Sequence, residues 1–178
     1  MIKRIVTLAA WQHALRNIFQ IRQALYLLLP LVFLSTSGCS SMKNWVLPQG
    51  SKLNWESLSM HVVAGANRDF PLAIDVVMVS DEALAQRLST MSSREWFAAR
   101  ESLRKTNPET LDVDSLEIAP GESLMQPGKR WSGRRVFAAL VFADYFAEGP
   151  HLARLESLKG RLHLEFGVTD FSVVASEK

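Results

Sequence analysis

RRVFAALVFADY, residues 134–145, is the stretch of sequence that decides the fold. It is the longest apolar run after residue 38, and it combines β-branched and aromatic side chains with small ones at Ala138, Ala139 and Ala143. β-Branched and aromatic residues favour strands, and strands buried on both faces read as continuous apolar runs. The stretch therefore predicts a central strand that is covered on both sides.

Two strand patterns precede this run. Residues 58–64 alternate, with Leu58, Met60 and Val62 on one face, which indicates a strand with one buried face. LAIDVVMV, residues 72–79, is apolar on both faces apart from Asp75 and predicts a second central strand. We expect these two strands to pair antiparallel across the polar loop between them.

Further strand patterns lie later in the chain. Residues 111–118 read as a strand that ends before Pro120-Gly121, and residues 162–166 alternate cleanly. Residues 168–174 continue this pattern, as the second strand of a hairpin or as part of one long bent strand. Leu152 to Leu158 predicts a short turn of helix.

A single helical segment follows the second central strand. Ser80 or Asp81 can cap its first turn, and Ser92 with Glu95 three residues later matches a capping box. The segment should end before Asn107-Pro108. We expect two short helices, or one helix broken in the middle, with an aromatic stripe that packs on the sheet.

Short strands with one helical insertion define the fold class. The pattern predicts a mainly β protein, a two-sheet β-sandwich with an inserted helical segment, in one domain over residues 57–178. The loop QPGKRWSG, residues 126–133, is rich in turn residues and contains Trp131, and we expect it to be an exposed connection.

The N-terminal stretch LYLLLPLVFLSTSGCSS, residues 25–41, reads as an export signal. Its apolar core of eleven residues is shorter than the roughly 20 that span a bilayer, basic residues precede it, and small residues follow it. Cys39 is the only cysteine of the chain. We expect residues 1–38 to be a lipoprotein signal peptide and residues 39–56 to be a tether.

The residues around Cys39 resemble the lipobox of bacterial lipoproteins, in which this cysteine becomes the acylated first residue. Ser37 and Gly38 match, whereas Thr36 stands where an aliphatic residue is usual. Ser40 in place of Asp implies, by resemblance to sorting rules, the periplasmic face of the outer membrane. The alternative is an incidental thiol behind an ordinary signal or anchor.

Charge and motifs argue against several functions. Without residues 1–38 the chain has 16 basic and 18 acidic residues, which does not favour nucleic acid binding. Its histidines, His61, His151 and His163, are isolated, and no metal-ligand, nucleophile or phosphate-loop motif occurs. Asp112 and Asp114 are expected on a solvated strand face. We expect no enzyme activity, no metal, no cofactor besides the lipid on Cys39, and no small-molecule substrate.

The order of these features resembles the TssJ (SciN) family, the outer-membrane lipoproteins of bacterial type VI secretion systems. The resemblance is carried by five stretches: Cys39, PLAIDVVMV from Pro71, REWFAARESL from Arg94, SLEIAPGES from Ser115, and RRVFAALVFADY. It extends over most of residues 57–178, and it fits a divergent TssJ-like member as well as a standard one.

The resemblance implies a transthyretin-like sandwich that is anchored in the outer-membrane lipid and binds the periplasmic part of the inner-membrane protein TssM. The family's partner contact corresponds by position to the loop Gly65, Ala66, Asn67, Arg68 and Asp69. From the residues alone this loop is a polar turn. The competing hypothesis is an unrelated envelope lipoprotein module that binds peptide, glycan or another envelope complex.

Overall fold

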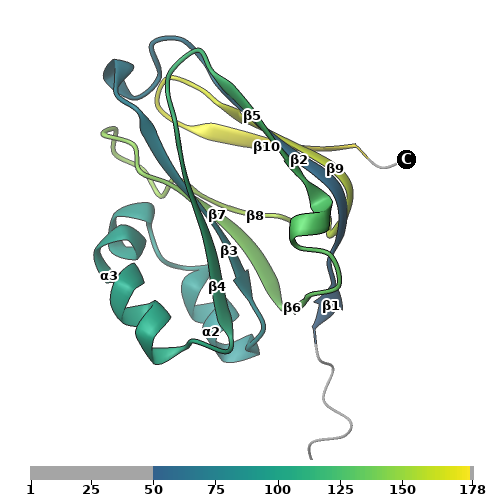
Figure 1. Ribbon diagram of the computed structural model, residues 1–178. Helices are drawn as coiled ribbons and strands as arrows, with labels where there is room; N and C mark the ends of the chain where they lie inside the picture. The colour runs from purple at the N-terminus through teal and green to yellow at the C-terminus, as the bar shows by residue number, and fades with distance from the viewer. Residues whose placement is uncertain (1–49, 177–178) are drawn as a thin grey trace, which may run out of the picture. The chain divides into compact units, whose positions relative to one another are not determined.

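The computed structural model describes residues 50–176 (Figure 1). The expected signal peptide, Cys39 and residues 39–49 of the expected tether lie outside the described residues. No helix within the described part is long and apolar enough to cross a membrane.

Two four-stranded sheets form the sandwich. One has the order β4-β3-β7-β8 and is antiparallel throughout, with β4 at Leu111–Ile118, β3 at Leu72–Val79, β7 at Ala138–Ala143 and β8 at Leu152–Arg154. The other has the order β10-β9-β2-β5, with β10 at Phe171–Ser176, β9 at Lys159–Phe166, β2 at Asn54–Val62 and β5 at Ser123–Pro127. Only its β2–β9 pair is parallel. The predicted two-sheet sandwich is confirmed.

A short two-stranded sheet closes one end, where β1 (Ser51–Lys52) pairs with β6 (Arg135–Val136). The folded part therefore begins before residue 57. The predicted end of the tether at residue 56 lies too far along the chain. Residues 51–56 have the polar composition of a linker, but they form β1 and the start of β2. Leu53 and Trp55 are buried in this segment.

Apolar side chains cover both faces of the β3–β7 pair. All six residues of β7 are buried, as is every residue of β3 except Ala73. One face meets the alternating apolar side chains of β2 and β9, such as Met60 and Leu164. The other face packs against the helices through Val77, Phe142 and their neighbours. The prediction of two central strands is confirmed.

Two helices cover the outer face of the β3–β7 sheet, and both have the predicted caps. In α2 (Glu82–Leu88) the Leu84 amide donates to Asp81 at 2.7 Å. In α3 (Ser93–Thr106) Ser92 and Glu95 form the capping box. The hydrogen bonds that the Glu95 carboxylate accepts from Ser92 lower the pKa of Glu95.

Asp75 is the polar side chain at the centre of the helix-covered face. Its side chain is 1% exposed and accepts a hydrogen bond from the indole of Trp96 at 2.8 Å. Arg100, on the next turn of α3, pairs with the same carboxylate at 3.2 Å. A buried charge needs such partners, so this cluster ties α3 to the middle of the sheet.

The structure corrects two further predictions about local structure. The loop around Trp131 is exposed at most of its residues, as predicted, but Trp131 itself is buried. It contains the turn η2 (Gly128–Arg130), and Trp131 is 1% exposed and packs edge-on against Trp55 at 5.4 Å. Residues 152–158 begin with strand β8 and not with a helical turn, because Val141 and Phe142 of β7 pair with Ala153 and Leu152.

The expected pairing of the first two strands is wrong. β2 and β3 are in different sheets, and the chain crosses between them through residues 63–71. The C-terminal hairpin is confirmed, since β9 and β10 pair antiparallel through a turn that is closed by a 2.8 Å hydrogen bond from the Gly167 amide to the Asp170 carbonyl.

Candidate partner-binding surface

The crossover between β2 and β3 contains the turn η1 (Ala66–Asp69). Three consecutive residues in it have left-handed backbones: Asn67 with φ 48°, Arg68 with φ 59° and Asp69 with φ 63°. Asn and Asp tolerate this region because their short side chains bond locally, whereas Arg adopts it rarely. The turn therefore has an unusual backbone that its surroundings must hold in place.

Asn67 provides much of that support. Its side chain is buried, accepts a hydrogen bond from the Phe146 amide at 2.8 Å, and donates one to the Pro71 carbonyl at 3.3 Å. Its own amide donates to the carbonyl of Val168 at 3.1 Å. One residue thus joins the crossover, the loop after β7 and the β9–β10 turn.

Four side chains project from these three segments, and we call them the apical surface: Arg68, Phe70, Phe146 and Val168. Phe70, Phe146 and Val168 are 58%, 52% and 58% exposed. The two phenylalanine rings meet edge to face at 5.5 Å, and the guanidinium of Arg68 lies 5.6 Å from the Phe146 ring centre. Clustered exposed aromatic and Arg side chains are typical of interaction sites.

The buried side chain of His151 holds the loop after β7 in place. His151 also has a left-handed backbone, with φ 40°, and is buried. Its Nε2 donates to the carbonyl of Ala147 at 2.9 Å, and its Nδ1 lies 3.2 Å from the Asp170 carboxylate. Tyr145 packs beside the imidazole ring and donates to the Gly167 carbonyl at 3.0 Å. Burial, together with the nearby charge of Asp170, raises the pKa of Tyr145.

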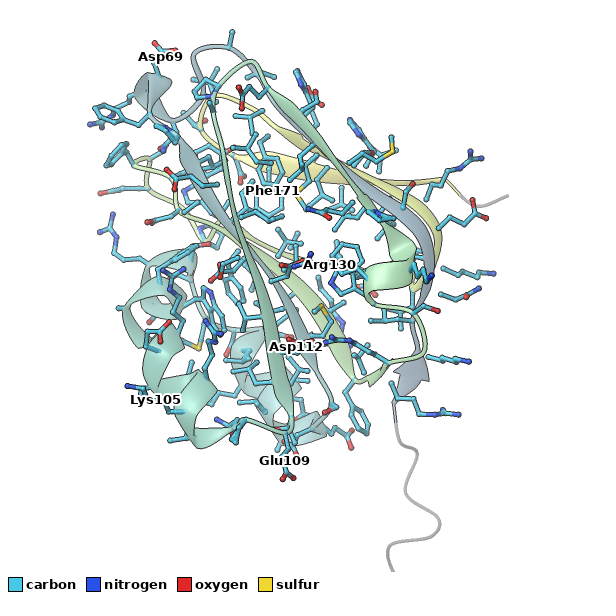
Figure 2. The ribbon with its side chains drawn as sticks, in the orientation of Figure 1. Asp69, Lys105, Glu109, Asp112, Arg130 and Phe171 are labelled. Carbon is cyan, nitrogen blue, oxygen red and sulfur yellow. The ribbon has the colours of Figure 1, made fainter. Side chains whose placement is uncertain are left out.

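The five residues predicted for partner contact lie together in one turn, but they differ in exposure. Ala66 and Asn67 are buried and can act only by positioning the others, whereas Arg68 and Asp69 are exposed. Figure 2 shows Asp69 at the tip of the turn. Sequence reasoning missed Phe70, which directly follows the predicted loop, and it missed Phe146 and Val168. The available signal was an apolar residue inside a turn-rich segment, DYFAEGP for Phe146 and GVTD for Val168.

The carboxylates weighed for catalysis do not converge. Asp114 is buried and not solvated as expected; Arg130 pairs with one of its oxygens, and the other has no hydrogen-bond partner among the described atoms. Asp112 is half-buried and pairs with Arg134. Both ion pairs join β4 to the loop around η2. The hollow that Asp112 lines does not include His163.

A histidine pair that the sequence did not predict lies on the open face of β2 and β9. His61 and His163 both face Glu165, with Nε2 to carboxylate distances of 3.8 Å and 3.1 Å. Their Nδ1 atoms hydrogen-bond to serine hydroxyls on the same face. No group of three or more His, Cys, Asp or Glu side chains among residues 50–176 is arranged to hold a metal ion.

One shallow hollow lies beside the apical surface, between the start of α3 and the loop after β7. It has a volume of about 200 Å³ and includes Arg94, Asp144, Glu148 and His151 in its lining. This volume is below the roughly 300–1,000 Å³ of typical small-molecule sites. The hollow is therefore small for a small-molecule site.

Comparison with known proteins finds likeness in structure and not in sequence. No family model and no curated protein matches the chain. The type VI secretion lipoprotein TssJ1 from Pseudomonas aeruginosa superposes with a TM-score of 0.50 at 15% identity, covering 72% of this chain and 99% of that one.

Two other solved structures give lower scores. Lip, a membrane-bound type VI secretion component from Serratia marcescens, has a TM-score of 0.49 at 15% identity and covers 72% of this chain and 100% of that one. The C-terminal domain of TssM from EAEC has a TM-score of 0.47 at 8% identity, with 71% and 100% covered. At such identities a likeness shows the fold, and the TssJ1 superposition confirms at that level the resemblance seen in the sequence: this chain has a divergent TssJ-like sandwich fold.

Proposed function

We propose that this protein is a lipid-anchored structural component of a type VI secretion membrane complex. Acylated Cys39 holds the sandwich at the periplasmic face of the outer membrane, and the apical surface binds the periplasmic domain of a TssM-like inner-membrane protein. The role is non-enzymatic. Support comes from the TssJ-like fold and from the lipobox-like residues before Cys39.

The observation that carries the partner-binding role is the distribution of backbone strain. Within residues 50–176, all four non-glycine residues with positive φ lie in the two loops of the apical surface: Asn67, Arg68, Asp69 and His151. Such conformations cost on the order of 1–3 kcal/mol each and persist only where the surroundings hold them, as at binding sites. Here the strained turns hold two exposed phenylalanine rings in one fixed arrangement.

A binding measurement tests the partner role. We expect the Phe70→Ser and Phe146→Ser variants of residues 40–178 to lose about 30-fold or more in affinity for the C-terminal domain of a TssM protein from the same secretion system, because truncating a central aromatic anchor costs about 2 kcal/mol or more. Met125→Ser is the matched control. Met125 is 71% exposed and lies on β5, on the face of the sheet that is not buried inside the sandwich. Equal losses in all three variants, or none, would contradict the assignment.

Fractionation tests the anchor. Several acyl chains hold a protein stably on a bilayer, since each buried methylene contributes about 0.8 kcal/mol. Replacing Cys39 by Ser in a chain exported through an ordinary signal peptide should leave a folded domain that a high-salt wash releases from membranes. Membrane retention that resists the wash would contradict the proposed acylation.

A further inference from the structure

Basic side chains gather at the end of the sandwich opposite the apical surface, and we call this set the basic corner. β1 and β6 lie at the lower end in Figure 1, whereas the turn with Asp69 lies at the upper end in Figure 2. Lys52 of β1 and Arg135 of β6 are direct partners across the short sheet. The full set is Lys52, Lys129, Arg130, Arg134, Arg135, Lys159 and Arg161, of which Arg130 reaches towards the middle of the molecule to pair with Asp114 (Figure 2).

Backbone contacts bring these residues together from four segments. The Leu53 amide bonds to the carbonyl of Arg134 at 2.8 Å, and the Gly133 amide bonds to the carbonyl of Leu53 at 3.4 Å, which places the η2 loop against the start of β2. On the other side Asn54 is in register with Lys159 of β9. The corner is therefore built on a rigid part of the fold.

The local charge is opposite to the charge of the whole domain. Residues 50–176 have fourteen Lys and Arg against seventeen Asp and Glu, yet half of the basic ones are in this corner. Asp114, Asp112 and Glu56 form ion pairs with Arg130, Arg134 and Arg161 of the corner. Glu109 lines a hollow together with Arg134 and Arg135. Lys52, Lys129 and Arg135 are exposed, and no ion pair is formed by them within the described part of the chain.

The corner is also the place where the chain from Cys39 joins the domain. Gly50 packs so tightly on β6 that a Cβ there would lie 2.5 Å from the backbone of Val136, so the point of attachment is fixed. The eleven residues from Cys39 to Gly50 can span at most about 40 Å. Lys52 is two residues beyond this point, closer along the chain to Cys39 than any other member of the corner.

We infer that the basic corner docks on the anionic phosphates of the lipid surface to which the chain is tethered. The inference rests on the proposed anchor at Cys39. Basic residues beside a lipid attachment add a second, electrostatic contact to the bilayer, which falls off within a Debye length and weakens with salt. This contact directs the opposite end, with the apical surface, away from the membrane and towards the periplasm.

Vesicle co-sedimentation of unlipidated residues 40–178 tests the docking, since residues 50–176 lie in one compact unit with its own core. We expect binding to phosphatidylcholine vesicles that contain about one third phosphatidylglycerol, loss of that binding between about 50 and 500 mM NaCl, and little binding to phosphatidylcholine alone. Each basic residue near such a surface contributes about fivefold to partitioning. The triple variant K52Q/K129Q/R135Q should therefore bind roughly 100-fold more weakly.

The matched control is R87Q/R94Q/K105Q, which removes the same charge from exposed positions on the helices. It should bind like the unchanged chain. Four results would each overturn the inference. They are equal sedimentation with both vesicle types, no sedimentation at low salt, equal loss of binding in both triple variants, and binding to peptidoglycan sacculi instead of vesicles. The unlipidated protein of residues 40–178 has no lipid anchor, and the assay contains no partner protein. Such a failure would therefore not contradict the proposed anchor at Cys39 or the proposed partner contact at the apical surface.

Discussion

Asn67 is the side chain whose replacement tests most directly how the apical surface is held. Asn67→Ala removes the acceptor for the Phe146 amide and the donor to the Pro71 carbonyl, and it places a residue with a Cβ but no local hydrogen bond at φ 48°. Asn67→Gly removes the same two hydrogen bonds but tolerates the backbone. Comparing the two variants separates the bonds from the strain.

The expected sizes follow from these contacts. Each hydrogen bond contributes about 1 kcal/mol, so Asn67→Gly should lower the free energy of unfolding by about 2 kcal/mol. Asn67→Ala adds about 1 kcal/mol for a left-handed residue with a Cβ, giving about 3 kcal/mol. For a domain of this size these losses lower the melting temperature by roughly 6–8 °C and 10–12 °C. Arg68→Gly is the neighbouring control at φ 59°; Arg68 is exposed, and its replacement should change stability by less than about 1 kcal/mol.

Urea unfolding followed by tryptophan fluorescence measures all three variants, and partner affinity is measured on the same samples. Both Asn67 variants should also weaken partner binding, because the Phe146 loop loses its link to the turn. A loss below about 0.5 kcal/mol for Asn67→Ala, or equal stabilities for the Asn67 and Arg68 variants, would refute the assignment of Asn67 as the support of the two loops.

Other substitutions test the packing beneath that surface. Asp75→Ala leaves a buried indole donor without its acceptor and should cost about 3–5 kcal/mol of unfolding free energy in urea. Arg100→Ala leaves the buried Asp75 carboxylate without its charge partner and should cost a similar amount; a loss below about 1 kcal/mol in either variant would contradict the central role of the carboxylate. Gly128→Ala puts a Cβ 1.8 Å from the carbonyl oxygen of Trp55, so η2 must move and the melting temperature should fall by an amount equivalent to about 2 kcal/mol or more; an unchanged value would show that the turn is loosely packed. Tyr145 is the only tyrosine after residue 38, so its raised pKa predicts that folded residues 40–178 show no tyrosinate absorbance near pH 10. Stability should fall above pH 10, because only the unfolded chain then releases the proton; a titration midpoint at 10 in the folded chain would contradict this.

Local signals in the sequence predicted the elements well. The bounds of β3 coincide with the apolar run LAIDVVMV, and both helix caps were visible as Asp81 and as the Ser92–Glu95 pair. These features depend on residues close together in sequence, namely the side-chain period and the hydrogen bonds of one helical turn. The length of the apolar run also sufficed to place β7 at the centre of a sheet.

The partners of the strands could not be predicted in the same way. The alternation in β2 specifies which face is buried but not which strand lies beside it. β2 pairs in parallel with β9, about one hundred residues later, and Met60 is in register with Leu164. The expectation of a β2–β3 hairpin failed because the crossover of residues 63–71 is long enough to pass from one sheet to the other.

Side chains whose burial depends on contacts between separate segments were the other source of error. Composition alone made Trp131 and Asp114 seem solvated, yet the first packs on Trp55 and the second pairs with Arg130. Both contacts join segments that are far apart in sequence, so neither has a local signature. The apical surface was incomplete for the same reason, since Phe146 meets the crossover through contacts with Asn67 and Phe70, which are far from it in sequence.

The arrangement of β2 shows how the two ends of the sandwich can act together. β2 starts beside the basic corner at Asn54 and ends at Val62, just before the crossover that contains Asn67, a span of about 27 Å for nine residues. It is an interior strand, paired with β5 on one side and in parallel with β9 on the other. A pull between an anchor before Gly50 and a partner on the apical surface therefore acts along the strand, and it must break many ladder hydrogen bonds at once instead of one at a time. The strand that joins the proposed membrane contact to the proposed partner contact is thus the one that the sheet holds from both sides.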